Sequence, residues 1–549
     1  MKEKKDVRPS FSHTWVRPFT PSDAVLVEEY RFGDTEVSLY DLPSESEDLY
    51  HVLPPEYEIG REKAKVISKV KDSLAEHQVK DMALSDPGQV KEYIRNRGKH
   101  LVKRMAEAFD LDLGDDRESE IKELENLAEM LIKYTAGYGV LETLLSDPRV
   151  EDIYVDAPSE RNRVYVEIEA PEGLREKCRT NIYLSSTDME SILSRFRFES
   201  GEPFSEAFPV LEADLPEYDT RITAIGSPLS SDGVALALRR RDPEPWTLPK
   251  LIKVGSLTPL AAGLLSFLID GRSTILVAGS RGAGKTTLLG ALMLEFPRSQ
   301  RILTIEDTRE LPSEEMQEID YNVQSVMIGS SAYKGGLNSN EVLRVSLRLG
   351  ESAIVMGEVR GEEARTLYEA MRAGTAGSSV MGTIHGNTAQ SVYDRVVHDM
   401  GISKESFSAT DIVMIAGIVR PGGMQKRVRK VTQISEYEDG GFSDLLNFDG
   451  ELRPTEFLKR DSEKIGEIAN SWGLSYSEAV ENIKLRAKIR EKMVKVAEKK
   501  DNEELLGPEW VAKANNKFWN LISKYGAERD YHKIEEEWMN WFEERTMYV

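Results

Sequence analysis

The stretch GSRGAGKTT, residues 279–287, constrains the fold more than any other part of the sequence. It fits the pattern G-x-x-x-x-G-K-[ST] in full. It stands between an apolar segment typical of a strand, STILVAG, and one typical of a helix, TTLLGALMLEF. Glycines in such a loop let backbone N–H groups wrap around a phosphate, and the helix N-terminus adds partial positive charge. We therefore predict a phosphate-binding loop whose nucleotide-binding residues are Gly279, Ser280, Arg281, Gly282, Ala283, Gly284, Lys285, Thr286 and Thr287.

Two side chains of this loop have predicted tasks. Lys285 would reach the β- and γ-phosphates of ATP, and the hydroxyl of Thr286 would ligate Mg²⁺. ATP and Mg²⁺ are thus the expected cofactors. The alternative interpretation is a glycine-rich turn that only joins a strand to a helix.

Hydrolysis of ATP needs carboxylates near the γ-phosphate, which hold the metal and orient or deprotonate water. Glu306 and Glu310 lie in the segment TIEDTRELP, and Glu358 ends an apolar segment in IVMGEVRG. His385 closes a third apolar segment, VMGTIHGN, where it could sense or hydrogen-bond the γ-phosphate. Parallel sheets place ligands at the carboxyl ends of their strands, which is where these residues fall. The competing interpretation takes the acids as solvated surface groups and the histidine as structural.

The pattern of apolar residues divides the 549-residue chain into five parts. Residues 1–144 are partly helical, 145–241 form a small α+β domain, 242–255 are a linker, 256–437 alternate strand and helix, and 438–549 are helical. The alternation in 256–437 predicts a mainly parallel sheet with helices on both faces. The expected strands are 273–279, 301–306, 352–359, 378–384 and 411–419, and the expected helices are 285–296, 339–349, 362–373 and 388–400. A capping box at residues 187–190 would open one more helix.

Net charge and cysteine usage narrow the classes of function. The formal net charge of -23 argues against a protein that coats a nucleic-acid backbone, although a local basic groove is compatible with it. The single cysteine, Cys178, rules out an internal disulfide and a cysteine-rich zinc module. The longest apolar run, residues 257–269, is shorter than the roughly 20 residues that a membrane span needs. No signal peptide is visible, so we expect a cytoplasmic protein whose contact with a membrane is peripheral.

Four segments in a fixed order carry a resemblance to a known family. GSRGAGKTT, TIEDTRELP, IVMGEVRG and MGTIHGN resemble the Walker A, Asp box, Walker B and His box of the secretion ATPase superfamily. That superfamily powers type II secretion, type IV pili, archaeal flagella and type IV secretion. The resemblance covers roughly residues 145–435 and is closest to archaeal members and tight-adherence pilus ATPases.

The resemblance implies a fold and an assembly. The fold class is α/β, with a RecA-like P-loop NTPase core and a mainly parallel sheet. A small α+β domain and a helical N-terminal region would precede the core, and a helical C-terminal domain would follow it. The family's members are homohexamers that bind ATP between the small N-terminal domain and the RecA-like domain. Their movement is passed to a platform protein in the membrane.

The resemblance also implies roles, residue by residue. Glu310 would position or activate water, Glu358 would act on the metal side, and Glu306 is an alternative to either. Arg221 and Arg239 resemble the arginines that reach the phosphates from the N-terminal domain and stabilise charge in the transition state. The competing interpretation of Arg239 is a solvated run of arginines before a linker.

One further arginine and one departure complete the comparison with the family. Arg360 matches the arginine after the Walker B glutamate, which could make an interface contact. Many members have Asp-Pro-Asp before the Walker B strand, where this chain has GESA at residues 350–353. Any role of that aspartate must pass to Glu351 or be absent.

These features favour a hexameric ATPase motor that drives assembly of pilus-like fibres or protein secretion across the cytoplasmic membrane. The alternatives are a RecA-like nucleic-acid translocase and a scaffold that binds nucleotide without hydrolysing it. The acidic balance, the His box and the lack of basic-aromatic platforms argue against the translocase, so no nucleic-acid partner is expected. The complete set of lysine, threonine and acids argues against the scaffold.

Overall fold

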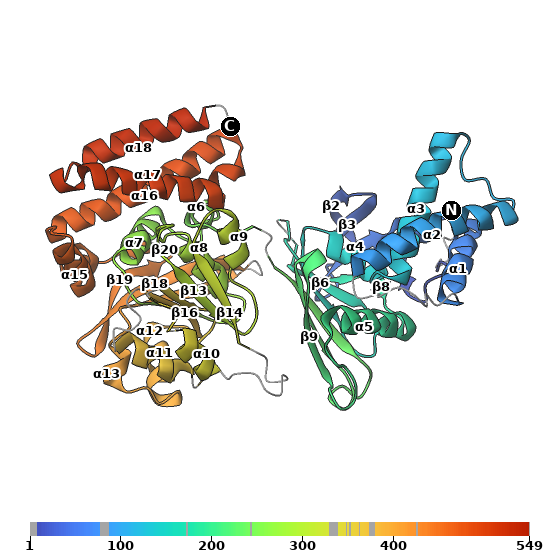
Figure 1. Ribbon diagram of the computed structural model, residues 1–549, viewed down its shortest axis with the longest axis horizontal. Helices are drawn as coiled ribbons and strands as arrows, with labels where there is room; N and C mark the ends of the chain where they lie inside the picture. Colours follow the sequence, from blue (N-terminus) through green and yellow to red (C-terminus); the bar gives the residue numbers. More distant parts are fainter. Residues whose placement is uncertain are drawn as a thin grey trace. The chain divides into compact units, whose positions relative to one another are not determined.

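The protein is described by a computed structural model that covers residues 8–76, 87–171, 174–241, 244–328, 339–346, 348–350, 353–361, 363–372, 379–423 and 427–547 (Figure 1). The chain forms two compact units, Met1–Pro243 and Glu244–Val549. Each unit has a large sheet and hydrophobic cores of its own.

The first unit combines short strands with N-terminal helices. Its strands are β1 (Trp15–Val16), β2 (Val25–Phe32), β3 (Thr35–Asp41), β4 (Asp48–Leu53), β5 (Val150–Val155), β6 (Val164–Ile168), β7 (Lys177–Thr180), β8 (Ile182–Tyr183), β9 (Val210–Leu215), β10 (Thr220–Ile225) and β11 (Ala235–Arg240). Its helices are α1 (Arg61–Glu76), α2 (Pro87–Ala108), α3 (Arg117–Thr135), α4 (Val140–Ser146) and α5 (Ser186–Ser200), with the 3-10 turns η1 (Pro55–Tyr57) and η2 (Pro216–Tyr218).

One large sheet organises the first unit. Over the described residues its strand order is β2-β3-β4-β7-β6-β5-β11-β10-β9, and only β4 and β7 pair in parallel. The sheet takes strands from both sides of residue 144, where we predicted the first of the domain boundaries. Its core likewise joins Leu39 and Tyr50 to Val166 and Cys178. Burial raises the pKa of the Cys178 thiol to about 12, as fits a packing role.

The start of α5 differs from the prediction. Ser185 is the N-cap and accepts a hydrogen bond from the backbone N–H of Asp188 (3.0 Å), so the capping box predicted at residues 187–190 is wrong. The carboxylate of Asp188 is engaged elsewhere, because it accepts hydrogen bonds from the backbone N–H (2.9 Å) and the hydroxyl (2.7 Å) of Thr14. An N-terminal segment far away in sequence is thus held at the first turn of this helix.

The second unit alternates strands and helices and then becomes helical. Its strands are β12 (Ile275–Gly279), β13 (Ile302–Glu306), β14 (Val323–Met327), β15 (Ala353–Met356), β16 (Val380–His385), β17 (Ile412–Val419), β18 (Val428–Glu438), β19 (Gly441–Asp449) and β20 (Glu451–Pro454). The helices as far as α13 are α6 (Leu248–Lys253), α7 (Pro259–Asp270), α8 (Lys285–Met293), α9 (Ser313–Glu318), α10 (Ser339–Ser346), α11 (Glu363–Arg372), α12 (Ala389–Asp394) and α13 (Lys404–Phe407). The later ones are α14 (Glu456–Arg460), α15 (Glu463–Ser471), α16 (Tyr476–Lys500), α17 (Pro508–Tyr525) and α18 (Tyr531–Thr546). The short helical turns are η3 (Arg395–Asp399), η4 (Pro421–Gly423), η5 (Glu503–Leu506) and η6 (Gly526–Glu528).

The sheet of the second unit is mainly parallel, as predicted. In the described part of the chain its order is β14-β13-β15-β16-β12-β17-β18-β19-β20, with parallel pairing from β14 to β17 and antiparallel pairing beyond. The predicted strands are confirmed as β12, β13, β15, β16 and β17, and the predicted helices as α8, α10, α11 and α12.

Two features of this sheet were not predicted. β14 and β18 were missed, and the helical prediction after residue 438 is wrong over β19 and β20. β18 and β19 are joined by Asp439 and Gly440, both with positive φ (48° and 81°), which is the backbone of a tight two-residue hairpin turn. The hairpin extends the sheet by antiparallel pairing.

Successive residues of β12 belong to two different cores. Ile275 and Val277 pack in the core that contains α7 and α8, whereas Leu276 and Ala278 pack in the core that contains α11 and α12. Because neighbouring strand residues point to opposite faces, helices cover both faces of the sheet, and β12 reads as a continuous apolar run. The longest apolar run of the sequence becomes the buried helix α7. In the part of the chain that the structure describes, no helix is long and apolar enough to cross a membrane.

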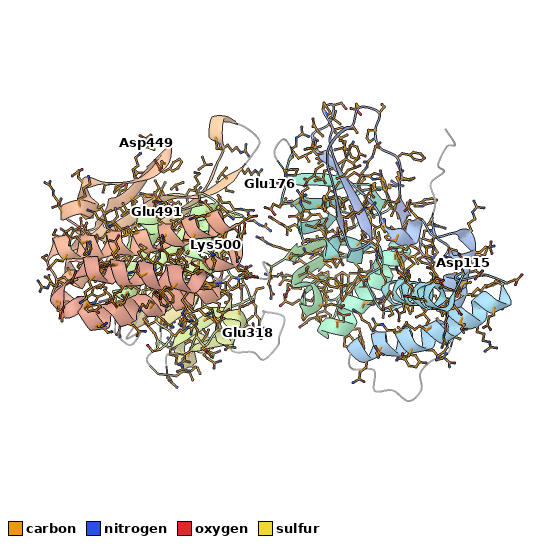
Figure 2. The ribbon with its side chains drawn as sticks, turned by 90° about the horizontal axis from the view of Figure 1, so that it is seen from above. Asp115, Glu176, Glu318, Asp449, Glu491 and Lys500 are labelled. Carbon is orange, nitrogen blue, oxygen red and sulfur yellow. The ribbon has the colours of Figure 1, made fainter. Side chains whose placement is uncertain are left out.

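The C-terminal helices have a core of their own. Trp538 is fully buried and stacks on Phe542 at a centroid distance of 5.0 Å. Basic side chains of α16 form ion pairs within this bundle: Lys488 pairs with Glu535 of α18, and Lys492 pairs with Glu543 of α18. Along its surface Lys495 pairs with Glu491, and Lys500 marks the helix end; Glu491 and Lys500 are labelled in Figure 2.

Candidate functional site

The phosphate-binding loop has the backbone geometry that its glycines predict. β12 is buried along its whole length and ends at Gly279, and α8 begins at Lys285. Gly282 and Gly284 have φ angles of +76° and +82°, which other residues rarely adopt. A Cβ atom at Gly279 would lie 2.4 Å from the carbonyl oxygen of Ala416 on β17, so this position needs glycine. The first turn of α8 leaves N–H groups available to an anion in the loop.

The polar side chains of the loop line its opening. Lys285 Nζ donates a hydrogen bond to the carbonyl oxygen of Ser280 (3.1 Å), and Thr286 is half-buried beside it. Ser280, Arg281 and Thr287 are exposed. The loop thus presents one ammonium group and one hydroxyl at the start of a helix, which is the set that the sequence analysis assigns to phosphate and Mg²⁺.

The strand register brings the predicted residues to one edge of the sheet. Gly279 of β12 lies opposite His385 of β16 on one side and opposite Ala416 of β17 on the other. β15 pairs with β16 and β13 pairs with β15, all in parallel. The carboxyl ends of these strands therefore meet at the same edge, with Glu306 at the end of β13 and Glu358 two residues after β15.

Glu358 is the centre of a charged cluster at this edge, which we call the edge cluster: Glu358, His385, Arg360 and Asp307. The Glu358 carboxylate lies 3.1 Å from His385 Nε2 and pairs with the guanidinium of Arg360, which also reaches Asp307 at 2.8 Å. Burial alone would raise the pKa of Glu358. The Arg360 hydrogen bond and the charges of Arg360, His385 and Lys285 outweigh it and lower the pKa below the ordinary value. The carboxylate is therefore ionised and feels the charge of the phosphate-binding lysine.

The acids of the Asp box have different surroundings. Glu306 is buried, and its Oε1 accepts hydrogen bonds from the backbone N–H groups of Glu310 (2.9 Å) and Leu311 (2.8 Å). A Cβ atom at Gly357 would lie 3.0 Å from Glu306 Cγ, so the glycine before Glu358 leaves room for this side chain. Glu310 is exposed on the turn that Glu306 holds. The pKa of Arg360 is raised chiefly by its hydrogen bond with Glu358, and the charge of Glu310 is a smaller cause. The carboxylate of Glu306 is thus engaged by the backbone, whereas the side chain of Glu310 faces solvent.

The residues at this edge fit a Mg²⁺ ion that is bound together with a nucleotide. Mg²⁺ in such sites uses one or two protein oxygens, and phosphate oxygens and waters complete its shell. Thr286 supplies a hydroxyl, and Glu358 supplies an ionised carboxylate close enough to feel Lys285. Among the described residues, no group of three or more His, Cys, Asp and Glu side chains forms a metal site without a ligand. Glu351 lies outside the described residues.

Arg221 and Arg239 lie in the first unit, directly opposite each other on the neighbouring strands β10 and β11. Arg221 has Glu212 at 3.5 Å, whereas Arg239 is exposed. The run of arginines around Arg239 is not uniformly solvated: Arg240 donates to the carbonyl of Asp147 (2.6 Å), and Arg241 pairs with Asp214. Paired residues of this kind project from the same face of a sheet, and this row also holds acids, since Asp214 is the cross-strand partner of Arg221 and Asp152 that of Arg239.

One residue at the loop was missed by the sequence analysis. Arg429 of β18 donates a hydrogen bond from Nε to the carbonyl oxygen of Gly282 (3.1 Å), and its Cδ lies 3.8 Å from where a Cβ of Gly284 would be. The signal in the sequence is the basic run RVRK at residues 427–430, shortly after the strand that pairs with β12. Arg429 holds the tip of the phosphate-binding loop against the sheet.

A strand, a glycine loop with lysine and threonine, and acids and a histidine at the neighbouring strand ends define a P-loop nucleotide-binding domain. The sequence model of the family described as "Type II/IV secretion system protein" matches residues 137–504, more than half of the chain. The chain belongs to this type II/IV secretion ATPase superfamily, as the four motifs predicted.

The individual proteins described next are each less than 30% identical to this chain in the matched region. An uncharacterized protein of Methanocaldococcus jannaschii is 27% identical over 395 residues, which are 69% of this chain and 51% of that protein, so the chain spans about half the length of this relative. A putative conjugal transfer protein of Mycobacterium tuberculosis is 29% identical over 279 residues, 50% of this chain and 75% of its own. The solved ATPase DotB of Legionella pneumophila is 16% identical with a TM-score of 0.39, and the match covers 63% of this chain and 85% of that chain.

Proposed function

We propose that the chain is a Mg²⁺-dependent ATPase that works as a homohexameric motor. It would power the assembly of pilus-like fibres or the secretion of proteins across the cytoplasmic membrane. Membership of the secretion ATPase superfamily supports this function. The observation that carries it is the contact of Glu358 with His385 at the sheet edge where the phosphate-binding loop begins.

Each residue of the edge has a proposed task. Lys285 and Thr286 bind the phosphates and Mg²⁺, and Glu358 acts on the metal side. Glu310 positions the attacking water, because it is exposed on a turn that Glu306 fixes through two backbone hydrogen bonds. His385 contacts Glu358 and is proposed to turn to the γ-phosphate when ATP binds, so that it reports whether that phosphate is present.

Arg221 and Arg239 are proposed to neutralise charge on the phosphates during hydrolysis. The two arginines lie directly opposite each other on neighbouring strands, so that one phosphate group would accept hydrogen bonds from both guanidinium groups. Binding and hydrolysis of ATP would then change how the arginine-bearing domain is held, and the chemical cycle would become rigid-body movement.

The movement is proposed to act on a platform protein in the cytoplasmic membrane. The chain would stay on the cytoplasmic side and would be held at the membrane by that partner. We expect no nucleic-acid partner, because the net charge is -23 and the positive groups around the loop are few. Expression with candidate platform proteins, followed by measurement of turnover, would identify the partner as the one that raises it. Stimulation by single-stranded DNA instead would favour a nucleic-acid translocase.

Two variants test the site assignment. Lys285→Ala should abolish ATP hydrolysis and leave the fold intact, because the phosphates lose their ammonium partner. Glu358→Gln should still bind a fluorescent ATP analogue and should lose about 10²-fold or more in turnover, because the neutral amide cannot serve the metal or the water. Phosphate release and fluorescence titration measure the two effects.

A matched control is Lys459→Ala, since Lys459 is a surface lysine of the same unit that pairs with Glu456 of its own helix. It should leave binding and turnover unchanged. Full turnover in Lys285→Ala would remove the site assignment. Loss of nucleotide binding in Glu358→Gln would assign this carboxylate to binding and not to hydrolysis. Mass photometry with ATP and Mg²⁺ should show six copies, and a monomer under all conditions would contradict the hexamer.

A further inference from the structure

The end of α8 is joined to the C-terminal helices by a buried ion pair. Glu295 lies two residues after the end of α8 and pairs with Arg490 of α16. The Glu295 side chain is 0% exposed and that of Arg490 is 4% exposed. Because α8 starts with Lys285 and Thr286, a single short helix connects the phosphate-binding residues to this ion pair.

Three further groups converge on the same place, which we call the helix junction: Glu295, Arg490, Ser266, Asn515 and the carbonyl of Leu294. Arg490 Nη2 donates to the hydroxyl of Ser266 on α7 (2.7 Å) and to Oδ1 of Asn515 on α17 (3.2 Å). Asn515 Nδ2 in turn donates to the carbonyl oxygen of Leu294 (3.2 Å), one residue after α8 ends. Two C-terminal helices therefore hold the end of α8 through directional contacts.

A second buried arginine reinforces the arrangement one turn earlier on α16. Arg486 donates to the carbonyl oxygen (3.2 Å) and the hydroxyl (3.0 Å) of Ser266, and it pairs with Asp270 at the end of α7. Its guanidinium lies over the ring of Phe518 on α17, at 4.6 Å from the centroid. α16 therefore contacts α7 through buried arginines, whereas its ion pairs with α18 lie at the surface.

The helix junction carries a desolvation cost, because it buries charged and polar groups. Within the described chain, Glu295 Oε1 and Arg490 Nε are buried without a hydrogen-bond partner. Burial lowers the pKa of Arg490 even though the charge of Glu295 opposes this shift. Apolar residues of similar size often replace a buried ion pair without loss of stability, so stability alone does not account for these residues. The directional contacts of Glu295 and Arg490 account for their presence, because such contacts fix the position and rotation of α8, which apolar packing would leave adjustable.

We propose that Glu295 and Arg490 are positioning residues that couple the nucleotide site to the C-terminal helices α16 and α17. The inference rests on the proposed nucleotide site. With roughly 1.5 Å per residue, the nine residues of α8 carry a displacement at Lys285 over about 13 Å to the helix junction. Nucleotide binding then changes the packing of α16 and α17, and these helices in turn set the position of the loop. The family model ends at residue 504, so α17 lies beyond the part that the family shares.

The first experiment uses the unmodified full chain. Hydrogen exchange is followed with and without ADP and Mg²⁺, at a concentration where fluorescence titration shows that nucleotide is bound. We expect amides of α16 and α17 around Arg490 and Asn515 to exchange at least about fivefold more slowly with nucleotide. The Lys285→Ala chain should show no such change. Bound nucleotide without any change in α16 and α17 would overturn the coupling.

The second experiment separates positioning from stability. The double variant Glu295→Met with Arg490→Met should unfold near the temperature of the parent chain, yet its Kd for a fluorescent ADP analogue should rise at least about fivefold. The matched control is Lys488→Met with Glu535→Met, a surface pair between α16 and α18 two residues away from Arg490. The control should keep the parent Kd.

The outcomes distinguish the two proposals. A parent chain that does not bind nucleotide removes the proposed function, and the coupling with it. A parent chain that binds, together with a folded double variant that binds equally well, removes only the coupling. If the double variant does not fold, the exchange of α16 and α17 in the unmodified chain decides.

Discussion

Two acid–arginine pairs of the second unit show how burial changes what the same chemistry can do. At the edge of the sheet, the side chain of Glu358 is 16% exposed and pairs with Arg360, whose side chain is 58% exposed; each has a second partner, His385 for Glu358 and Asp307 for Arg360. At the end of α8, Glu295 and Arg490 are almost fully buried. Both pairs belong to the second unit: Glu358 follows β15 at the sheet edge where the loop begins, and Glu295 follows the end of α8.

The difference lies in how easily each pair can rearrange. Water reaches Arg360 and His385, the two partners of Glu358, so these two side chains can exchange contacts at a smaller cost than a fully buried pair when phosphate arrives. At the helix junction both side chains are buried, so separation of the pair would leave a buried charge uncompensated. The exposed pair therefore suits a switch, and the buried pair suits a rigid connection.

The largest effect is expected from the arginines outside the second unit. If the edge cluster switches partners during hydrolysis, additional cations must neutralise the transition state, and Arg221 and Arg239 are the candidates. Arg221→Ala together with Arg239→Ala should lower turnover on the order of 10³-fold and weaken ATP binding far less. Phosphate release and fluorescence titration measure both quantities. Arg241→Ala, which removes a neighbouring arginine paired with Asp214, is the control and should change neither. Equal losses in binding and turnover would contradict a transition-state role.

A direct comparison of the two pairs should give the next largest effect. Arg490→Met leaves Glu295 buried and unpaired, so the free energy of unfolding should fall by about 3–5 kcal/mol. Arg360→Met makes the matching change at the exposed pair and should lower it by less than about 1 kcal/mol. Denaturant unfolding, monitored by the fluorescence of the chain's seven tryptophans, measures both variants. Similar losses in the two variants would remove the contrast between switch and connection.

Much of the second unit could be predicted from the sequence because its signals are local. A buried parallel strand reads as a continuous apolar run, and the glycines of the phosphate-binding loop are required by backbone angles and by close approach to β17. The strand ends then place Glu306, Glu358 and His385 at one edge without further information. The failures have equally specific causes. The two-residue turn at Asp439 and Gly440 is a hairpin signal that we overlooked between two charged, helix-like stretches.

Other features depend on contacts that no local pattern contains. Which Asp-box acid is held by backbone N–H groups follows from how the turn after β13 folds back on Glu306. The contact of Arg429 with Gly282 joins residues far apart in sequence, as do the contacts of Arg490 with Ser266 and Asn515. An arginine in a basic helix looks like a solvated group, and only the packing of α16 against α7 shows that it is buried.

The smallest expected effect concerns the pH dependence of the exposed pair. Burial alone would raise the pKa of Glu358, but Arg360, His385 and Lys285 lower it below the ordinary value of 4.5. A carboxylate with a lowered folded-state pKa contributes stability above the unfolded-state pKa, and this contribution is lost as the pH falls through the folded-state pKa. Removal of Arg360 weakens the contribution, so wild type and Arg360→Met should differ most near pH 7 and converge below about pH 4. Urea unfolding of both chains across this range measures the difference. A gap that widens on acidification would mean that Arg360 stabilises the fold through contacts other than its pair with Glu358, and the edge cluster would then be less able to rearrange than its exposure indicates.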